Sequence, residues 1–390
     1  MKKEIIPYSR QRIYPDDVQG VKRVLISDFL TTGLTGESFE KKFSKYVKAK
    51  FSVGVNSATS ALHIACKALG LSTGDYLWTS PNSFVASSNC ALYCGSKVDF
   101  VDIELENYNI DINLLEKKLL KAKKFNKLPK IIVPVLYAGH PHDMSQLKKL
   151  SKKYNFKIIE DASHALGAKY YGQKVGSCKY SDVTVFSMHP VKMITTAEGG
   201  IATTNNKVYY NKMKLLRSHG ITRNRKDFYK KKYNITYYEQ HLLGFNYRLN
   251  DIQSSLGITQ LKKINLFLSQ RRKIKKFYDK ELKEYPLILP KEKKNIKSSW
   301  HIYPILVDQK KTNKKKDHLL KYLRKNNILA NTHYIPIPSQ PFYKKLGFKE
   351  KDFKNSLYFY KQEISLPIYV GLSNKKLKFV ISKIKDFFKN

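Results

Sequence analysis

Short apolar runs bounded by turn residues alternate with helical patterns from about residue 20 to residue 265, and this alternation is the strongest constraint on the fold. Alternating strands and helices are typical of α/β proteins, whose mostly parallel sheet carries helices on its faces. Seven apolar segments have the length and composition of strands: 51–55, 76–80, 98–102, 130–136, 156–160, 183–187 and 200–204. We therefore expect an α/β fold whose large domain contains a mostly parallel, seven-stranded sheet.

The pattern changes after Asn250. Residues 251–282 predict a long amphipathic helix or a pair of helices. The segments beyond 299 alternate again between strand-like and helix-like patterns and predict a smaller α/β domain. We place the large domain at 1–265, with an N-terminal arm at about 1–20, and the small C-terminal domain at 266–390. Lys-rich segments at 223–232 and 310–317 predict exposed loops.

The chain is strongly basic, because 73 Lys and Arg against 31 Asp and Glu give a formal net charge of +42. Such a charge makes a basic nucleic-acid-binding protein a candidate reading. Ten of the basic residues are Arg and they are scattered, whereas sites for polyanions favour clustered Arg because guanidinium makes forked contacts to phosphate. We therefore interpret the charge as a solvated basic surface that would attract small anionic ligands, and we keep nucleic-acid binding as the alternative.

Targeting and cysteine patterns indicate an intracellular protein. The N-terminal residues MKKEIIPYSRQRIYPDD have no apolar stretch of signal-peptide length, and no apolar run is long enough for a membrane helix. The cysteines Cys66, Cys90, Cys94 and Cys178 do not have the spacing of a zinc site. We expect a cytoplasmic protein with reduced cysteines, no metal site and no membrane partner.

The segment KIIEDASHALGA, residues 157–168, is the first that suggests chemistry. Its apolar strand ends with Glu160 and Asp161, so a carboxylate lies at the carboxyl edge of the sheet, where open α/β proteins bind ligands. The alternative is a structural role, because Asp followed by small residues also caps helices.

The segment DVTVFSMHPVKMITTAEGGIATT, residues 182–204, is the second. A buried strand leads to Ser187 and His189, and a turn containing Pro190 carries Lys192 between that strand and the next. A single loop lysine in so Lys-rich a chain could be an ordinary surface residue. The spacing from Asp161 to Lys192 across a strand-turn-strand layout favours a functional lysine.

Pyridoxal phosphate (PLP) chemistry needs a lysine amine that holds the cofactor covalently, a carboxylate that keeps the pyridine nitrogen protonated, and donors that bind the phosphate. Lys192 can supply the amine and Asp161 the carboxylate. The residues Ser57, Ala58 and Thr59 at the start of the helix after 51–55, helped by Ser187, can bind the phosphate, because a helix N-terminus has unpaired N–H groups. Simple helix capping is the alternative for Ser57 and Thr59.

Motifs along most of the chain resemble those of DegT-type nucleotide-sugar aminotransferases, and more narrowly the members that serve pseudaminic-acid biosynthesis. The motifs are NSATSALHIA, SPNSFVASSNCALYCG, VPVLYAGHPHDM, EDASHALGA, FSMHPVKMITTAEGGIATTN, LRSHGI, LGFNYRLNDIQSSLGITQL, HYIPIP and EISLPIY. The resemblance implies an aspartate-aminotransferase-like fold, PLP as cofactor, a homodimer with composite active sites, and glutamate as amino donor to C4 of a UDP-4-keto-6-deoxy-N-acetylhexosamine.

The resemblance also assigns roles to residues. It makes Lys192 the covalent anchor and Asp161 the partner of the pyridine nitrogen, and it places His164, where many relatives carry Gln, against the cofactor ring. Asn246 corresponds to a residue that reaches the cofactor phosphate from the other subunit. The positions implied for substrate binding are Tyr8, Asp28, Phe29, Leu30, Thr31, Ala58, Ser187, Asn246, Asn331, Thr332, His333 and Tyr334.

Other readings remain open at this point. The chain could be an aminotransferase for another nucleotide-linked keto sugar, or a protein of this fold that acts only as a scaffold. Relatives that dehydrate sugars carry His in place of the anchoring lysine, so Lys192 favours transamination.

Overall fold

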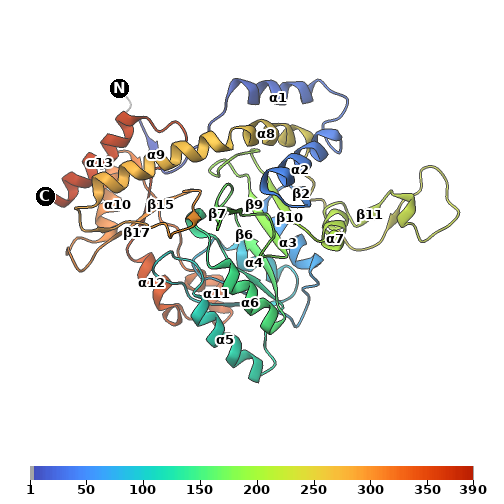
Figure 1. Ribbon diagram of the computed structural model, residues 1–390, viewed down its shortest axis with the longest axis horizontal. Helices are drawn as coiled ribbons and strands as arrows, with labels where there is room; N and C mark the ends of the chain where they lie inside the picture. Colours follow the sequence, from blue (N-terminus) through green and yellow to red (C-terminus); the bar gives the residue numbers. More distant parts are fainter. Residues whose placement is uncertain (1–3, 390) are drawn as a thin grey trace.

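The computed structural model describes residues 4–389, and its centre is a seven-stranded sheet (Figure 1). The four pairings from β9 to β4 are parallel, whereas β10 is antiparallel to both of its neighbours. The strands in spatial order are β2 (Phe51–Val55), β10 (Gly200–Thr204), β9 (Val183–Ser187), β6 (Lys157–Asp161), β5 (Ile131–Val133), β3 (Tyr76–Thr79) and β4 (Lys97–Phe100). The predicted α/β fold with a mostly parallel seven-stranded sheet is confirmed.

Helices cover both faces of this sheet. Strand residues alternate between the two faces, so that Ile131 and Val133 pack toward α3 and α4 while Ile132 packs toward α5 and α6. The helices associated with the sheet are α2 (Leu34–Val47), α3 (Ala58–Ala68), α4 (Ala86–Leu92), α5 (Ile112–Lys124), α6 (Met144–Tyr154) and α7 (Lys207–Arg217). Burial on both faces explains why the strands are short, nearly continuous apolar runs.

The C-terminal third has a hydrophobic core of its own, to which Tyr278, Ile305, Ile364 and Val380 belong. The predicted long helix is a pair, α8 (Asp251–Lys262) and α9 (Ile264–Leu282), and α9 runs from the large sheet to this second core (Figure 1). The other elements here are β13 (Leu287–Ile288), β15 (Tyr303–Val307), α10 (Lys316–Lys325), β16 (Ile328–Leu329), α11 (Pro341–Lys345), α12 (Lys354–Tyr360), β17 (Glu363–Leu366) and α13 (Asn374–Lys389). Strands β13, β15 and β17 form an antiparallel sheet.

The predicted exposed loop at 310–317 is wrong at its end. Lys316 begins α10 and is buried. Its Nζ donates to the carbonyl oxygen of Tyr360 at 2.8 Å and lies over the Tyr360 ring. The stem of a lysine packs as an apolar chain, and this is why a Lys-rich segment can still enter a core.

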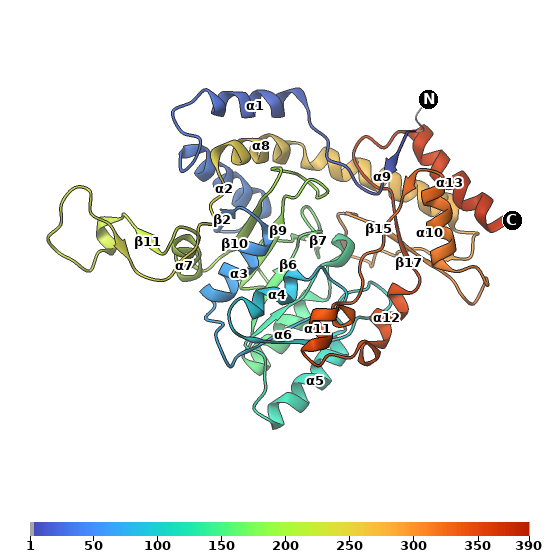
Figure 2. The ribbon, with the colours of Figure 1, turned by 180° about the vertical axis from the view of Figure 1, so that it is seen from behind.

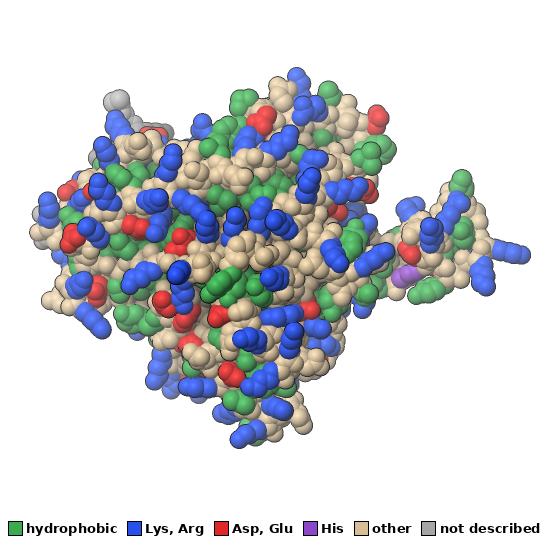
Figure 3. All heavy atoms as spheres, in the orientation of Figure 1, with side chains coloured by type: hydrophobic (Ala, Val, Ile, Leu, Met, Phe, Trp, Pro, Cys, Tyr) green, Lys and Arg blue, Asp and Glu red, His purple; other side chains and the backbone are tan. Residues whose placement is uncertain are grey.

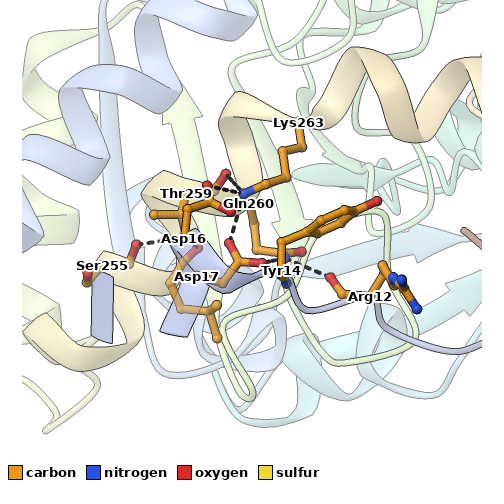
Figure 4. Close-up of polar contacts among 9 residues, drawn as sticks. Arg12, Tyr14, Asp16, Asp17, Ser255, Thr259, Gln260 and Lys263 are labelled. Atoms are coloured by element: carbon orange, nitrogen blue, oxygen red, sulfur yellow. Dashed lines mark hydrogen bonds and ion pairs between the residues drawn. The ribbon is translucent and has the colours of Figure 1, made fainter. Parts of the chain in front are cut away.

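The N-terminal segment ties the two parts of the molecule together. Strand β1 (Ile6–Pro7) pairs with β16 of the C-terminal part, whereas α1 (Pro15–Leu25) packs on α8. Asp17, which is fully buried, accepts hydrogen bonds from the Tyr14 backbone and from Gln260, and Lys263 donates to Asp17 at 3.1 Å (Figure 4). These bonds anchor the start of α1 on α8, while the β1 pairing fixes the residues next to Tyr8.

A two-stranded arm extends away from the body of the molecule (Figures 1 and 2). Its strands are β11 (Ile221–Thr222) and β12 (Glu239–Gln240), and apolar side chains between them face solvent, with Ile235 87% and Tyr229 82% exposed. The remaining short elements are β7 (Lys169–Tyr170), β8 (Gln173–Lys174), β14 (Ile296–Lys297) and the 3₁₀ helices η1 (Tyr137–Gly139), η2 (Arg225–Asp227), η3 (Ile337–Ser339) and η4 (Glu350–Asp352).

Basic side chains are spread over all parts of the face seen in Figure 3, as expected for a solvated basic surface. Between residues 4 and 389, no helix combines the length and the apolar character that crossing a bilayer requires.

Candidate active site

A cavity of about 540 Å³ opens at the carboxyl ends of β6 and β9, between the large sheet and the C-terminal part. This is the edge at which parallel α/β sheets bind ligands. Twelve of the predicted site residues line it: Tyr8, Ser57, Ala58, Thr59, Asp161, His164, Ser187, Lys192, Asn331, Thr332, His333 and Tyr334. Residues from five separate stretches of sequence therefore meet in one place.

Asp161 is the last residue of β6 and is buried at the edge of the cavity. Its Oδ2 accepts a hydrogen bond from Ser87 Oγ at 2.6 Å, and its Oδ1 accepts from the hydroxyl and the backbone N–H of Ser163. The next element after Asp161 is strand β7 and not a helix, so helix capping does not explain this carboxylate. The hydroxyl donors fix the carboxylate in a buried position, where it can face a cationic ring nitrogen.

Lys192 lies in the loop between β9 and β10. The loop is closed by backbone hydrogen bonds, among them Lys192 N–H to His189 at 2.8 Å and Thr196 N–H to Met188 at 3.0 Å. Burial lowers the pKa of Lys192 to about 8, although the Asp161 carboxylate acts in the opposite direction. A lysine with this pKa supplies the uncharged amine near neutral pH, which is the reactive form of a nucleophile.

The N-terminus of α3 faces the same cavity. Ser57 is its N-cap and accepts a hydrogen bond from the Ser60 backbone, so the capping alternative holds for this hydroxyl. The Ala58 and Thr59 N–H groups lie in the first turn, where no intrahelical partner exists, and can bind an anion. A β-carbon at Gly200 would collide with the Ser57 carbonyl and lie 2.5 Å from Ala58 N, so glycine at this position lets β10 pass beneath the helix start.

His164 and Tyr334 form one wall of the cavity. The Tyr334 hydroxyl and His164 Nε2 are 3.0 Å apart, and the His164 ring lies against that of His301 with centroids at 4.3 Å. Burial, reinforced by the Lys192 cation, holds the pKa of His164 well below its usual range. His164 Nδ1 is buried without a hydrogen-bond partner among the described residues.

Tyr8 of the N-terminal segment and His333 continue this wall of the cavity, since the His333 and Tyr334 rings lie 4.9 Å apart. The rings of Tyr8 and His333 lie 5.0 Å apart, and Tyr8 is held by the bond from the Ile368 N–H to its carbonyl oxygen. Burial raises the pKa of Tyr8 and lowers that of His333 to about 3. Both side chains are therefore uncharged hydrogen-bonding groups at neutral pH.

Five predicted site residues lie away from the cavity of their own chain. The stretch from Asp28 to Thr31 follows α1 and is exposed, with Phe29 64% and Leu30 47% accessible. Asn246 is also exposed, and it bridges to Ser218 near the base of the arm. The resemblance implies that these residues act in the cavity of a second copy of the chain.

The structure adds residues that the sequence did not single out. Ser83, Phe84, Val135 and Ser163 also line the cavity, and Ser87 contacts Asp161 from a position 74 residues earlier in the chain. The Ser-rich motif SPNSFVASSNC carries the signal for Ser83 and Ser87, since it combines turn residues with hydroxyls directly after a strand.

A family model described as the DegT/DnrJ/EryC1/StrS aminotransferase family matches residues 11–385. The chain belongs to this family. It is 41% identical over 377 residues to the UDP-4-amino-4,6-dideoxy-N-acetyl-beta-L-altrosamine transaminase of Campylobacter jejuni strain 81-176, and the match covers 96% of both chains. It is thus a sugar aminotransferase with the expected fold.

Two solved structures extend the comparison. Helicobacter pylori PseC, described as an aminotransferase involved in the biosynthesis of pseudoaminic acid, is 35% identical and superposes with a TM-score of 0.89 over 99% of this chain and all of the other. The putative sugar aminotransferase Spr1654 from Streptococcus pneumoniae, in its PMP form, is 28% identical with a TM-score of 0.89, covering 98% and 99% of the two chains. A PLP form of Spr1654 is also similar. Family membership confirms the expected cofactor, PLP.

Proposed function

We propose that this aminotransferase moves an amino group from glutamate to C4 of a UDP-4-keto-6-deoxy-N-acetylhexosamine, giving UDP-4-amino-4,6-dideoxy-N-acetyl-β-L-altrosamine for a pseudaminic-acid-type glycan. The observation that carries the proposal is the meeting of Lys192, Asp161 and the α3 N-terminus in one cavity. The Campylobacter jejuni relative, named for this product, supports the choice of sugar.

The residues present fit PLP. The buried carboxylate of Asp161 suits a protonated pyridine nitrogen, the first turn of α3 suits a phosphate dianion, and Lys192 suits the aldehyde carbon. The unpartnered Nδ1 of His164 is a buried polar atom that lacks the hydrogen bond such atoms almost always make. That atom is closed off from the cavity, so the fit to PLP rests on Asp161, Lys192 and the first turn of α3.

When bound, PLP withdraws electrons from the carbon that bears the amino group. Asp161 supports this by keeping the ring nitrogen protonated, since its two oxygens are already oriented by Ser87 and Ser163. With the cofactor bound and its own amine free, Lys192 would act as general acid and base: it would take the proton from the donor's α-carbon and deliver it to the former aldehyde carbon of the cofactor. A lysine pKa of about 8 allows both roles near neutral pH.

The sugar is held by uncharged groups. Burial shifts the pKa values of Tyr8, His333 and Tyr334 so that all three stay neutral. Neutral side chains suit the hydroxyl, carbonyl and amide groups of a sugar better than they suit a charged carboxylate. Asn331 and Thr332 add polar groups to the same wall.

The active enzyme in this proposal is a homodimer with composite sites. The exposed apolar side chains Phe29, Leu30 and Leu34, together with Tyr229 and Ile235 of the arm, form surfaces that a second copy would bury. In that arrangement, Asn246 and the Asp28–Thr31 stretch of one protomer complete the cavity of its partner.

The proposal includes the cytoplasm as the site of action and no nucleic-acid or membrane partner. Cys66, Cys90, Cys94 and Cys178 are all free thiols in the structure, as a reducing compartment favours.

The visible absorption spectrum of the purified protein tests the proposal. Glutamate should bleach the band of the bound cofactor, and a UDP-4-keto-6-deoxy-N-acetylhexosamine should restore it. A GDP-linked 4-keto-6-deoxy sugar is the informative comparison, because other relatives are named GDP-perosamine synthase. If the GDP-linked sugar restored the absorption band faster than the UDP-linked sugar, the proposed substrate would be wrong. A protein that stays colourless with added PLP would overturn the enzyme proposal.

A further inference from the structure

Three side chains form a connected line behind the cavity wall. His333 Nδ1 lies 2.9 Å from Ser365 Oγ, Ser365 Oγ is hydrogen-bonded to Glu363 Oε1, and Glu363 Oε2 accepts the backbone N–H of His333 at 2.8 Å. Glu363 and Ser365 are two residues apart on β17, so both point to the same face of that strand. Both are fully buried and neither lines the cavity, whereas His333 does.

The neutral imidazole of His333 carries one proton, either on Nδ1 or on Nε2. The hydrogen bond between Nδ1 and Ser365 decides which nitrogen carries the proton. If Ser365 donates to Nδ1 the proton is on Nε2, and if Ser365 accepts from Nδ1 the proton is on Nδ1. The Tyr137 hydroxyl donates to the carbonyl oxygen of His333 at 2.8 Å, so its proton is not available to Ser365. Ser365 also lies near the Tyr137 oxygen, but its close side-chain hydrogen bonds are with Glu363 and His333. With one proton of its own, Ser365 accepts from one of these two when it donates to the other.

Which side chain donates and which accepts in these two hydrogen bonds therefore depends on the protonation of Glu363. A neutral Glu363 donates to Ser365, which then donates to His333 Nδ1 and leaves the ring proton on Nε2. Now let these three side chains lose one proton to solvent, from His333 Nε2. The Ser365 proton then moves to His333 Nδ1, and the Glu363 proton moves to Ser365. The ionised Glu363 then accepts from Ser365, and Nε2 becomes a bare acceptor.

Burial raises the pKa of Glu363 to about 8, so the neutral acid predominates at pH 7. The other groups facing Glu363 are the hydroxyls of Tyr108, Tyr137 and Tyr334, which burial keeps un-ionised, and Lys316 of α10, the one cation among them, which favours the ionised form. The lysine amine is bonded to the Tyr360 carbonyl oxygen and does not contact the carboxyl group directly.

We propose that Glu363 and Ser365 are positioning residues that make His333 present a hydrogen-bond donor at Nε2 to an oxygen of the bound sugar at neutral pH, and an acceptor once Glu363 ionises. That the sugar lies against His333 rests on the proposed function. The state of the His333 ring rests only on the bonds among these three side chains.

The ring state is measured by ¹⁵N NMR of protein labelled at histidine, without added cofactor or substrate, with the His333→Gln variant to assign the signals. We expect the Nε2–H form at pH 7 and a change to the Nδ1–H form through about pH 8. Glu363→Gln should keep the Nε2–H form at higher pH, because its amide donates to Ser365 without titrating. A wild-type ring in the Nδ1–H form at pH 7, or a Gln variant that changes like the wild type, would overturn the proposal.

Ser365 variants supply the matched control. Ser365→Ala should abolish the pH-linked change of the His333 signals, and Ser365→Thr, which keeps the hydroxyl on a strand residue, should retain it. With both substrates, Ser365→Ala should raise KM for the keto sugar several-fold and leave the glutamate half-reaction near the wild-type rate. If the NMR result holds while KM for the sugar does not change, the control of the His333 ring by Glu363 and Ser365 stands and the proposed contact between His333 and the sugar fails.

Discussion

At the scale of single residues, Lys192 carries the largest predicted effect. Lys192→Ala should bind PLP through Asp161 and the α3 N-terminus, yet show no multiple turnover, because the covalent anchor and the proton-transfer group are both lost. Lys212→Ala, at an exposed position on α7, is the control and should behave as the wild type. Turnover by Lys192→Ala at the wild-type rate would contradict the assignment.

The pKa of Lys192 also predicts how cofactor capture depends on pH. The uncharged amine attacks the aldehyde of PLP, and the amine fraction rises as the pH passes upward through about 8. Capture of PLP by the cofactor-free protein, followed by stopped-flow absorbance, should therefore accelerate about tenfold for each pH unit well below that value and level off above it. A midpoint near the ordinary lysine pKa would show that burial does not act as argued.

At the scale of elements, the decisive contact is that between β10 and the start of α3. Gly200→Ala places a methyl group against the Ser57 carbonyl and Ala58 N, which should displace the phosphate-binding turn and destabilise the fold by about 1–3 kcal/mol. PLP affinity and thermal unfolding together measure this effect. Gly54→Ala, on the neighbouring strand β2, meets its neighbours at 3.5 Å or more and should be tolerated. Equal behaviour of the two variants would mean that the α3 turn can move at no cost.

At the scale of the whole molecule, composite sites predict recovery of activity on mixing. Lys192→Ala and Asn246→Ala should each be inactive or severely impaired as homodimers. A mixed dimer has one cavity with both lesions and one with neither, so co-refolded or co-expressed mixtures should regain up to about half of the activity per mixed dimer. Light scattering measures the dimer, and activity of the mixture no higher than the sum of its parents would contradict a shared cavity.

The sequence by itself determined the parts of the protein that depend on local patterning. All seven strands of the large sheet lie within or overlap the predicted segments, because a strand buried on both faces is a short apolar run wherever it occurs. The same reasoning placed Asp161 at the end of a strand and Lys192 in the loop between two strands, since each position follows from the strand beside it. The family motifs added the N-terminal and C-terminal residues of the cavity.

Only the tertiary structure decided which distant side chains meet. Three such features join separate elements of the chain: the antiparallel pairing of β10 with β9, the contact between Ser87 and Asp161, and the hydrogen bonds that connect Glu363 and Ser365 of β17 with His333. Such contacts leave no periodic trace, because hydrophobic pattern reports whether a side chain is buried and not what it is buried against. Glu363 shows this most clearly, since the carboxyl group in the apolar segment EISLPIY contacts the cavity residue His333 only because β17 packs behind it.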